Sequence, residues 1–167
     1  MLNPLPETIN IINDYSLLLG PKHKVLGMHL RCAGYLADRK EQIAMITPDV
    51  LIQIPKRMQS MMSQMYVAHN SIVIFLSTDS TAVEIFLKRI FADYRIIVYN
   101  PYPRGHTTGN NANYLTIQQA LVDMYLISQA KTIIYTKSSG FSEAIRALNT
   151  PSIVHTLNIN KTVVTAV

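Results

Sequence analysis

Apolar and polar positions along this chain follow two alternating periods. Short apolar runs with the length of buried strands occur at Val25–Leu30, Ser71–Leu76, Arg95–Tyr99, 131–136 and 152–156. Between and around them, apolar residues spaced three or four apart predict helices over 5–19, 80–92, 114–129 and 140–149. Strands that alternate with amphipathic helices are typical of an α/β fold with a doubly wound parallel sheet.

The part of the chain between the first two predicted strands has a less regular pattern. We expect a long, partly irregular loop over 32–46, followed by a helix that starts at Thr47-Pro48 with threonine as its N-cap. Pro55 is expected to break or kink this helix, whose Met-rich continuation reaches about Val67. Residues 100–113 are rich in Pro, Gly, Asn and Thr, and a loop of this length is a candidate functional segment.

The length of 167 residues is sufficient for one domain with its own core. We divide this single domain into an amino-terminal helix (1–23), a sheet core with its helices (24–156) and a tail (157–167). Apolar residues make up 49% of the chain and charged residues 15%, which fits a sheet covered on both faces or a flank that packs on another protein.

The net charge of +5 favours anionic partners. The basic residues are scattered and do not alternate with aromatic residues, so nucleic acid is a weaker candidate than a small phosphate-bearing ligand. Cys32 is the single cysteine and cannot form a disulfide within the chain, and the five histidines lack the spacing of zinc ligands. We therefore expect no metal site.

The amino-terminal sequence MLNPLPETIN lacks the basic region and the apolar core of a signal peptide. No apolar run approaches the ~20 residues that span a membrane. These features favour the cytoplasm and leave the compartment itself undetermined.

Three polar clusters lie at the carboxyl ends of predicted strands: His29-Leu30-Arg31, Ser77-Thr78-Asp79-Ser80 and Lys137-Ser138-Ser139-Gly140. In a doubly wound sheet these ends meet at one edge, where ligands bind. The helix that follows the third cluster, with Phe141-Ser142 in its first turn, directs unpaired backbone N–H groups toward that edge, and phosphate is a natural ligand for them. The pattern predicts a nucleotide or sugar-nucleotide pocket.

Each of these residues also has a structural interpretation. Arg31 could form a structural ion pair, and His29 could be a core histidine with satisfied hydrogen bonds. The segment Thr78-Asp79-Ser80 could contain an ordinary helix N-cap, and Ser138-Ser139 could likewise be a cap. Asp123, inside an apolar helix, could bond a neighbouring backbone group or an arginine. The presence of all three clusters at one edge favours a ligand site.

The segments that carry these residues resemble, in order, the three motifs of the fucosyltransferase superfamily, which includes α1,6-, bacterial α1,2- and protein O-fucosyltransferases. The matching segments are Val25–Arg31, Phe75–Ser80 and Leu121–Ala130 followed by Ser138–Ser142, and the resemblance covers about residues 24–155. It implies the carboxyl-terminal, Rossmann-like half of a GT-B glycosyltransferase. Such an enzyme takes fucose from GDP-fucose, transfers it with inversion and needs neither a metal nor another cofactor.

The resemblance also implies roles for individual residues. Arg31 would be the catalytic residue, because it would clamp the diphosphate and stabilise the leaving GDP. His29 and Asp79 would contact guanine or ribose. The other residues expected to bind the GDP-sugar are Ser80, Ser138, Ser139, Gly140, Phe141 and Ser142, with Asp123 in a supporting role.

The chain departs from the family pattern directly after Arg31. Many relatives carry further basic and acidic residues there, whereas this chain has Cys32–Tyr35, so no base for the acceptor hydroxyl is identified. Asp38, Arg39 and Glu41 lie just downstream and could substitute.

The chain also accounts for only one of the two GT-B halves. Two functions therefore stay open: a GDP-fucose-dependent transferase acting on a glycan or protein acceptor, and a non-catalytic remnant that serves as a structural or interaction subunit. A partner chain could supply the missing half. Four methionines, Met58, Met61, Met62 and Met65, could form such a partner's packing face or belong to the core.

Overall fold

The computed structural model describes residues 4–36, 41–44, 48–65, 67–101, 113–136, 140–148 and 153–157, without the side chains of 33–36, 41–44, 48–50, 69 and 153–157. Its main sheet contains β1 (Val25–Leu30), β4 (Val73–Thr78), β5 (Arg95–Ile97), β6 (Thr132–Thr136) and β7 (Ile153–Leu157). All neighbours are parallel, in the order β5-β4-β1-β6-β7. The predicted doubly wound α/β sheet is confirmed.

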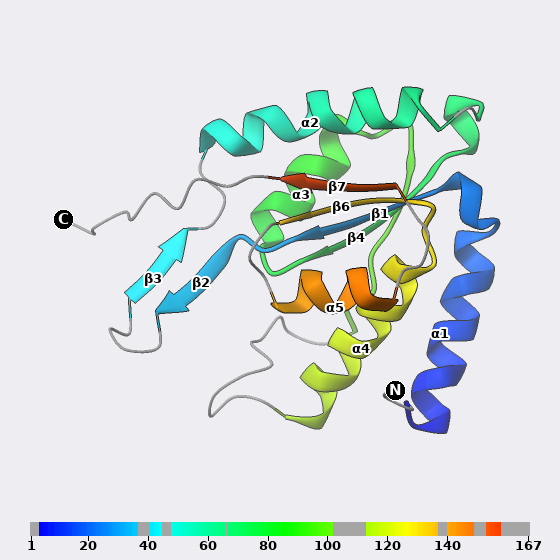
Figure 1. The fold of residues 1–167 in the computed structure, drawn as a ribbon, viewed down its shortest axis with the longest axis vertical. Coiled ribbons are helices and arrows are strands. Elements are labelled where there is room, and N and C mark those ends of the chain that lie inside the picture. Colours follow the sequence, from blue (N-terminus) through cyan, green and yellow to red (C-terminus); the bar gives the residue numbers. More distant parts are fainter. Residues whose placement is uncertain are drawn as a thin grey trace.

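Helices cover both faces of this sheet (Figure 1). On one face, α2 (Pro48–Ser63) and α3 (Thr81–Ile90) pack on the alternate β1 residues Leu26, Met28 and Leu30. The opposite face carries α1 (Pro6–Leu19), α4 (Tyr114–Ser128) and α5 (Gly140–Leu148). Because the β1 side chains alternate between the two faces, every one of its residues is buried, as the continuous apolar run predicts.

The predicted loop over 32–46 is wrong in part. Two short strands, β2 (Ala33–Leu36) and β3 (Glu41–Ala44), pair antiparallel within it. Each strand is only four residues long, which is too short for a periodicity to be recognised in the sequence.

Of the break or kink predicted at Pro55, the break is wrong, since α2 runs through Pro55 and ends at Ser63; the kink stays a prediction. An internal proline removes one hydrogen bond and costs about 3 kcal/mol. The buried side chains of Ile54, Met58 and Met62 pack α2 onto the sheet and offset that cost. Met65 is buried in the same cluster and Met61 packs against it, so these methionines belong to the core.

Strand β4 begins and ends two residues later than predicted, so Ser77 and Thr78 pair with β1 instead of following the strand. Short 3-10 turns precede β1 (Lys22–Lys24) and β4 (His69–Ser71). Most of the predicted functional loop, 102–112, and the tail from 158 lie outside the described residues. No helix in the described part of the chain is long and apolar enough to cross a membrane.

Gly27 in β1 lies in close contact with the end of helix α4 and the segment that follows it. A Cβ atom at this position would lie 3.0 Å from Cγ2 of Ile127, 3.1 Å from Cβ of Ala130 and 3.2 Å from the backbone oxygen of Ile127. Glycine is therefore needed here for close packing between β1 and α4.

We predict that Gly27→Ala lowers the free energy of unfolding by about 1–3 kcal/mol, because the added methyl overpacks the contact between β1 and α4. Urea denaturation measures this change. Gly140→Ala is the matched control, since its Cβ would meet nothing within 4 Å. Equal destabilisation by both substitutions would contradict the packing argument.

Candidate functional site

The order of strands in the sheet reverses at β1. Strands β4 and β5 lie on one side of it, and β6 and β7 lie on the other. The chain connections diverge at such a point and leave a crevice at the carboxyl ends of the strands. The register places His29 between Ser77 of β4 and Tyr135 of β6, and Leu30 beside Thr78. The first two predicted polar clusters therefore meet.

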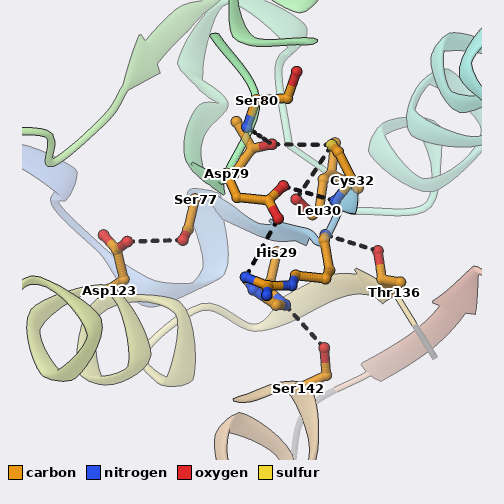
Figure 2. Close-up of polar contacts among 11 residues, drawn as sticks. His29, Leu30, Cys32, Ser77, Asp79, Ser80, Asp123, Thr136 and Ser142 are labelled. Atoms are coloured by element: carbon orange, nitrogen blue, oxygen red, sulfur yellow. Dashed lines mark hydrogen bonds and ion pairs between the residues drawn. The ribbon is translucent and has the colours of Figure 1, made fainter. Parts of the chain in front are cut away.

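Asp79 joins the end of β4 to the end of β1. Its Oδ1 accepts the backbone N–H of Cys32 at 2.7 Å (Figure 2). Its Oδ2 lies 3.3 Å from Nη1 of Arg31. The ion pair that we gave as a structural interpretation of Arg31 is therefore present. The side chains of Arg31 and Asp79 are 27% and 18% exposed, so a ligand at this edge can reach the guanidinium group.

Thr78 and Ser80 order the turn around Asp79. Oγ1 of Thr78 accepts the backbone N–H of Ser80 at 3.2 Å and lies 3.3 Å from Sγ of Cys32. Oγ of Ser80 accepts the backbone N–H of Val83 at 3.3 Å, which makes Ser80 the N-cap of α3. The N-cap predicted within Thr78-Asp79-Ser80 is confirmed and is Ser80, whose contact with a nucleotide stays a prediction.

Thr136, the last residue of β6, is a site residue that the sequence analysis missed. Its buried side chain accepts the backbone N–H of Arg31 through Oγ1 at 3.0 Å. The sequence feature that could have indicated Thr136 is its position, as a threonine at the end of an apolar strand and just before a polar segment. Arg31 is consequently held through its backbone by β6 and through its side chain by the residue that follows β4.

His29 lies on the face of β1 that α5 covers. Its Nδ1 is 2.9 Å from Oγ of Ser142, and its ring stacks on Phe141 with a centroid distance of 4.3 Å and an interplanar angle of 27°. The residue is only 6% exposed. Burial, aided by the charge of Arg31, lowers the pKa of His29 to about 3, so the ring is neutral near pH 7. These contacts support the interpretation of His29 as a core histidine whose hydrogen bonding is satisfied within the protein.

The predicted supporting residue Asp123 lies in α4 and is buried. Its Oδ2 accepts the hydroxyl hydrogen of Ser77 at 2.7 Å. A buried carboxylate needs such hydrogen bonds to offset its desolvation. This contact ties α4 to β4 two residues before Asp79, and Figure 2 shows Asp123 and Ser77 facing each other.

The third predicted cluster is described only in part, because Ser138 and Ser139 lie outside the described residues. Gly140, Phe141 and Ser142 form the first turn of α5, as predicted. Ser142 is fully buried against His29. An open, mainly apolar groove of about 360 Å³ lies between α4 and α5, lined by Ile117, Ala120, Leu121, Met124, Gly140, Phe141 and Ala144.

The arrangement suits recognition of an anion. A partly exposed guanidinium lies at the carboxyl edge of a parallel sheet, on a backbone fixed from two sides. Its planar fork of donors matches the oxygens of phosphate or diphosphate. Among the described residues, no group of three or more His, Cys, Asp and Glu side chains could hold a metal ion.

We predict that the stability of the protein falls on acidification because of His29. In the unfolded chain this ring titrates near its ordinary pKa of 6.5, whereas the folded protein keeps it neutral down to about pH 3. The stabilisation from the neutral ring is therefore complete above pH 6.5 and is lost as the pH falls toward 3. By pH 5 the loss reaches about 2 kcal/mol.

Urea unfolding at pH 7.5 and pH 5 in the wild type and in His29→Gln measures this loss. The variant should lack most of the pH dependence, and His23→Gln, at an exposed position, should retain it. The same pH dependence in His29→Gln as in the wild type would contradict the assignment.

Comparison with known proteins gives matches at the level of structure. No protein-family model matches this chain, and no curated protein matches it in sequence. The structure of NodZ α-1,6-fucosyltransferase soaked with GDP-fucose superposes with a TM-score of 0.63 at 22% identity, over 88% of this chain and 43% of that chain. NodZ from Bradyrhizobium, in selenomethionine form, gives a TM-score of 0.59 at 21% identity, over 86% and 42%.

A mutant of Arabidopsis thaliana FUT1 in complex with GDP gives a TM-score of 0.61 at 14% identity, over 93% of this chain and 34% of that chain. The chain thus spans less than half the length of these structures. Both a fucosyltransferase from Bradyrhizobium and one from Arabidopsis thaliana superpose on nearly all of this chain. The chain has a fucosyltransferase-like fold.

Proposed function

We propose that this chain binds GDP-fucose at the carboxyl edge of its sheet and contributes to the transfer of fucose to a glycan or protein acceptor. The observation that carries the proposal is the position of Arg31, a partly exposed cation at the reversal point of the sheet. Support comes from the fold, which the chain shares with fucosyltransferase structures that contain GDP or GDP-fucose.

The chemistry of the donor explains why an arginine is needed. When the bond between fucose and the diphosphate breaks, negative charge develops on the leaving GDP. A guanidinium group that already faces the diphosphate stabilises this charge more in the transition state than in the ground state. In the proposed reaction the acceptor hydroxyl attacks the anomeric carbon from the opposite side, which gives inversion.

The base that would accept the proton of this hydroxyl is not assigned. Of the two carboxylates among the downstream residues, Asp38 lies outside the described residues and Glu41 begins β3; Arg39, which could replace only a missing basic residue, also lies outside them. Binding of the donor and transfer of the sugar are therefore separate proposals with separate tests.

A second candidate function is that of a non-catalytic remnant of the fold, which serves as a structural or interaction subunit. It is favoured by the segment directly after Arg31, since Cys32–Tyr35 contain no acidic and no basic side chain. The Met-rich face of α2 does not support it, because Met58 and Met62 are buried in the chain's own core. Release of GDP from GDP-fucose in the presence of acceptor glycans, compared between the wild type and Arg31→Ala, separates the two candidates.

We predict that Arg31→Ala weakens GDP and GDP-fucose binding about 10- to 100-fold, which corresponds to the loss of charge-assisted hydrogen bonds. Arg31→Lys should lose less, since it keeps the charge without the planar fork. Calorimetric titration measures both, with UDP and ADP as selectivity controls. Arg89→Ala, at an exposed position near the end of α3, is the matched control and should bind like the wild type. Unchanged affinity in Arg31→Ala would refute the site.

A further inference from the structure

The role of Asp79 follows from the direction of its carboxylate. The two oxygens contact two consecutive residues that follow β1: Oδ1 the backbone N–H of Cys32 at 2.7 Å, and Oδ2 the guanidinium of Arg31 at 3.3 Å. The register that pairs Leu30 with Thr78 brings Asp79 beside Arg31. The carboxylate is therefore engaged across the sheet edge.

The backbone at Arg31 is held on both sides. The N–H of Arg31 donates to Oγ1 of Thr136 at 3.0 Å, and the N–H of Cys32 donates to Asp79. Because β6 and the residue after β4 hold the backbone here, the conformational freedom of Arg31 is mainly that of its side-chain rotamers. The ion pair with Asp79 restricts this freedom as well.

We propose that Asp79 is a positioning residue that orients Arg31 toward the phosphates of a nucleoside diphosphate, and that it acts on the ligand through Arg31 instead of binding the base or the ribose. This inference rests on the proposed function. An arginine with free rotation loses side-chain entropy each time it binds a ligand, whereas one already restrained by Asp79 loses less.

The negative charge of Asp79 also repels a phosphate, and this effect opposes the benefit of positioning. Both side chains are partly exposed, so solvent and salt screen the repulsion. Positioning depends on direct contact between the two groups and is not screened in the same way. We expect the benefit of positioning to exceed this repulsion, and the sign of the change in Asp79→Asn tests it.

Asp79→Asn tests this role because an asparagine keeps an oxygen for the N–H of Cys32 and removes the charge that faces Arg31. GDP affinity is measured by NMR-detected titration, extended to millimolar GDP for the weak variants. The set contains the wild type, Asp79→Asn, Arg31→Ala and the double variant. We expect Asp79→Asn to weaken GDP binding three- to tenfold in the wild-type background and to have no further effect when Arg31 is alanine.

Asp93→Asn is the matched control, because it removes one negative charge at an exposed position before β5. It should leave GDP affinity unchanged. Urea unfolding of each variant shows whether the fold is retained, and only the coupling between positions 31 and 79 distinguishes positioning from a structural role.

Three results would overturn the inference while leaving the proposed function intact. They are an equal loss in both backgrounds, as expected for contact with the base or ribose, an unchanged affinity in Asp79→Asn, and a tighter affinity in Asp79→Asn. Absence of GDP binding in the wild type would instead contradict the proposed function itself.

Discussion

The site depends on two backbone N–H groups at the carboxyl end of the central strand β1, those of Arg31 and Cys32, each of which needs a hydrogen-bond partner. The N–H of Arg31 is bonded by Thr136 of β6, and the N–H of Cys32 is bonded by Asp79 after β4. Buried or half-buried backbone groups are costly without partners, so the sequence around the switch point must supply them. These hydrogen bonds hold Arg31 at the edge where parallel sheets bind ligands.

The packing below this edge supports the same geometry. Close contact at Gly27 seats α4 against β1, and the hydrogen bond between Asp123 and Ser77 ties the same helix to β4. On the same face of the sheet, the neutral His29 connects β1 to the first turn of α5 through Ser142 and Phe141. The helix that carries the predicted phosphate-binding turn is thus positioned by a residue two places before the arginine.

Much of this architecture can be predicted from the sequence because its causes are local or periodic. The continuous apolar run of Val25–Leu30 and the proline- and glycine-delimited helices predict strand β1, the parallel sheet and the edge at which Arg31 lies. The motifs around Arg31 and Asp79 also predict the fucosyltransferase-like fold. The meeting of the first two polar clusters follows from the general rule that parallel strands end at one edge.

The remainder depends on contacts between distant segments. The β2–β3 pairing involves only four residues on each strand, and the course of α2 through Pro55 depends on tertiary packing. Ser142 in α5, the partner of the His29 ring, and Thr136 in β6, the partner of the Arg31 backbone N–H, lie about a hundred residues away in the chain, and no periodicity specifies them. For the same reason the sequence leaves open whether His29 faces a ligand or the core.

The central claim is that the end of β1 is a diphosphate site with Arg31 as its cation. A crystal structure of the protein with GDP bound tests it most directly. The account predicts that the diphosphate lies at the carboxyl end of β1, with its oxygens within hydrogen-bond distance of the Arg31 guanidinium. GDP bound elsewhere, or at this edge without contact to Arg31, would contradict it.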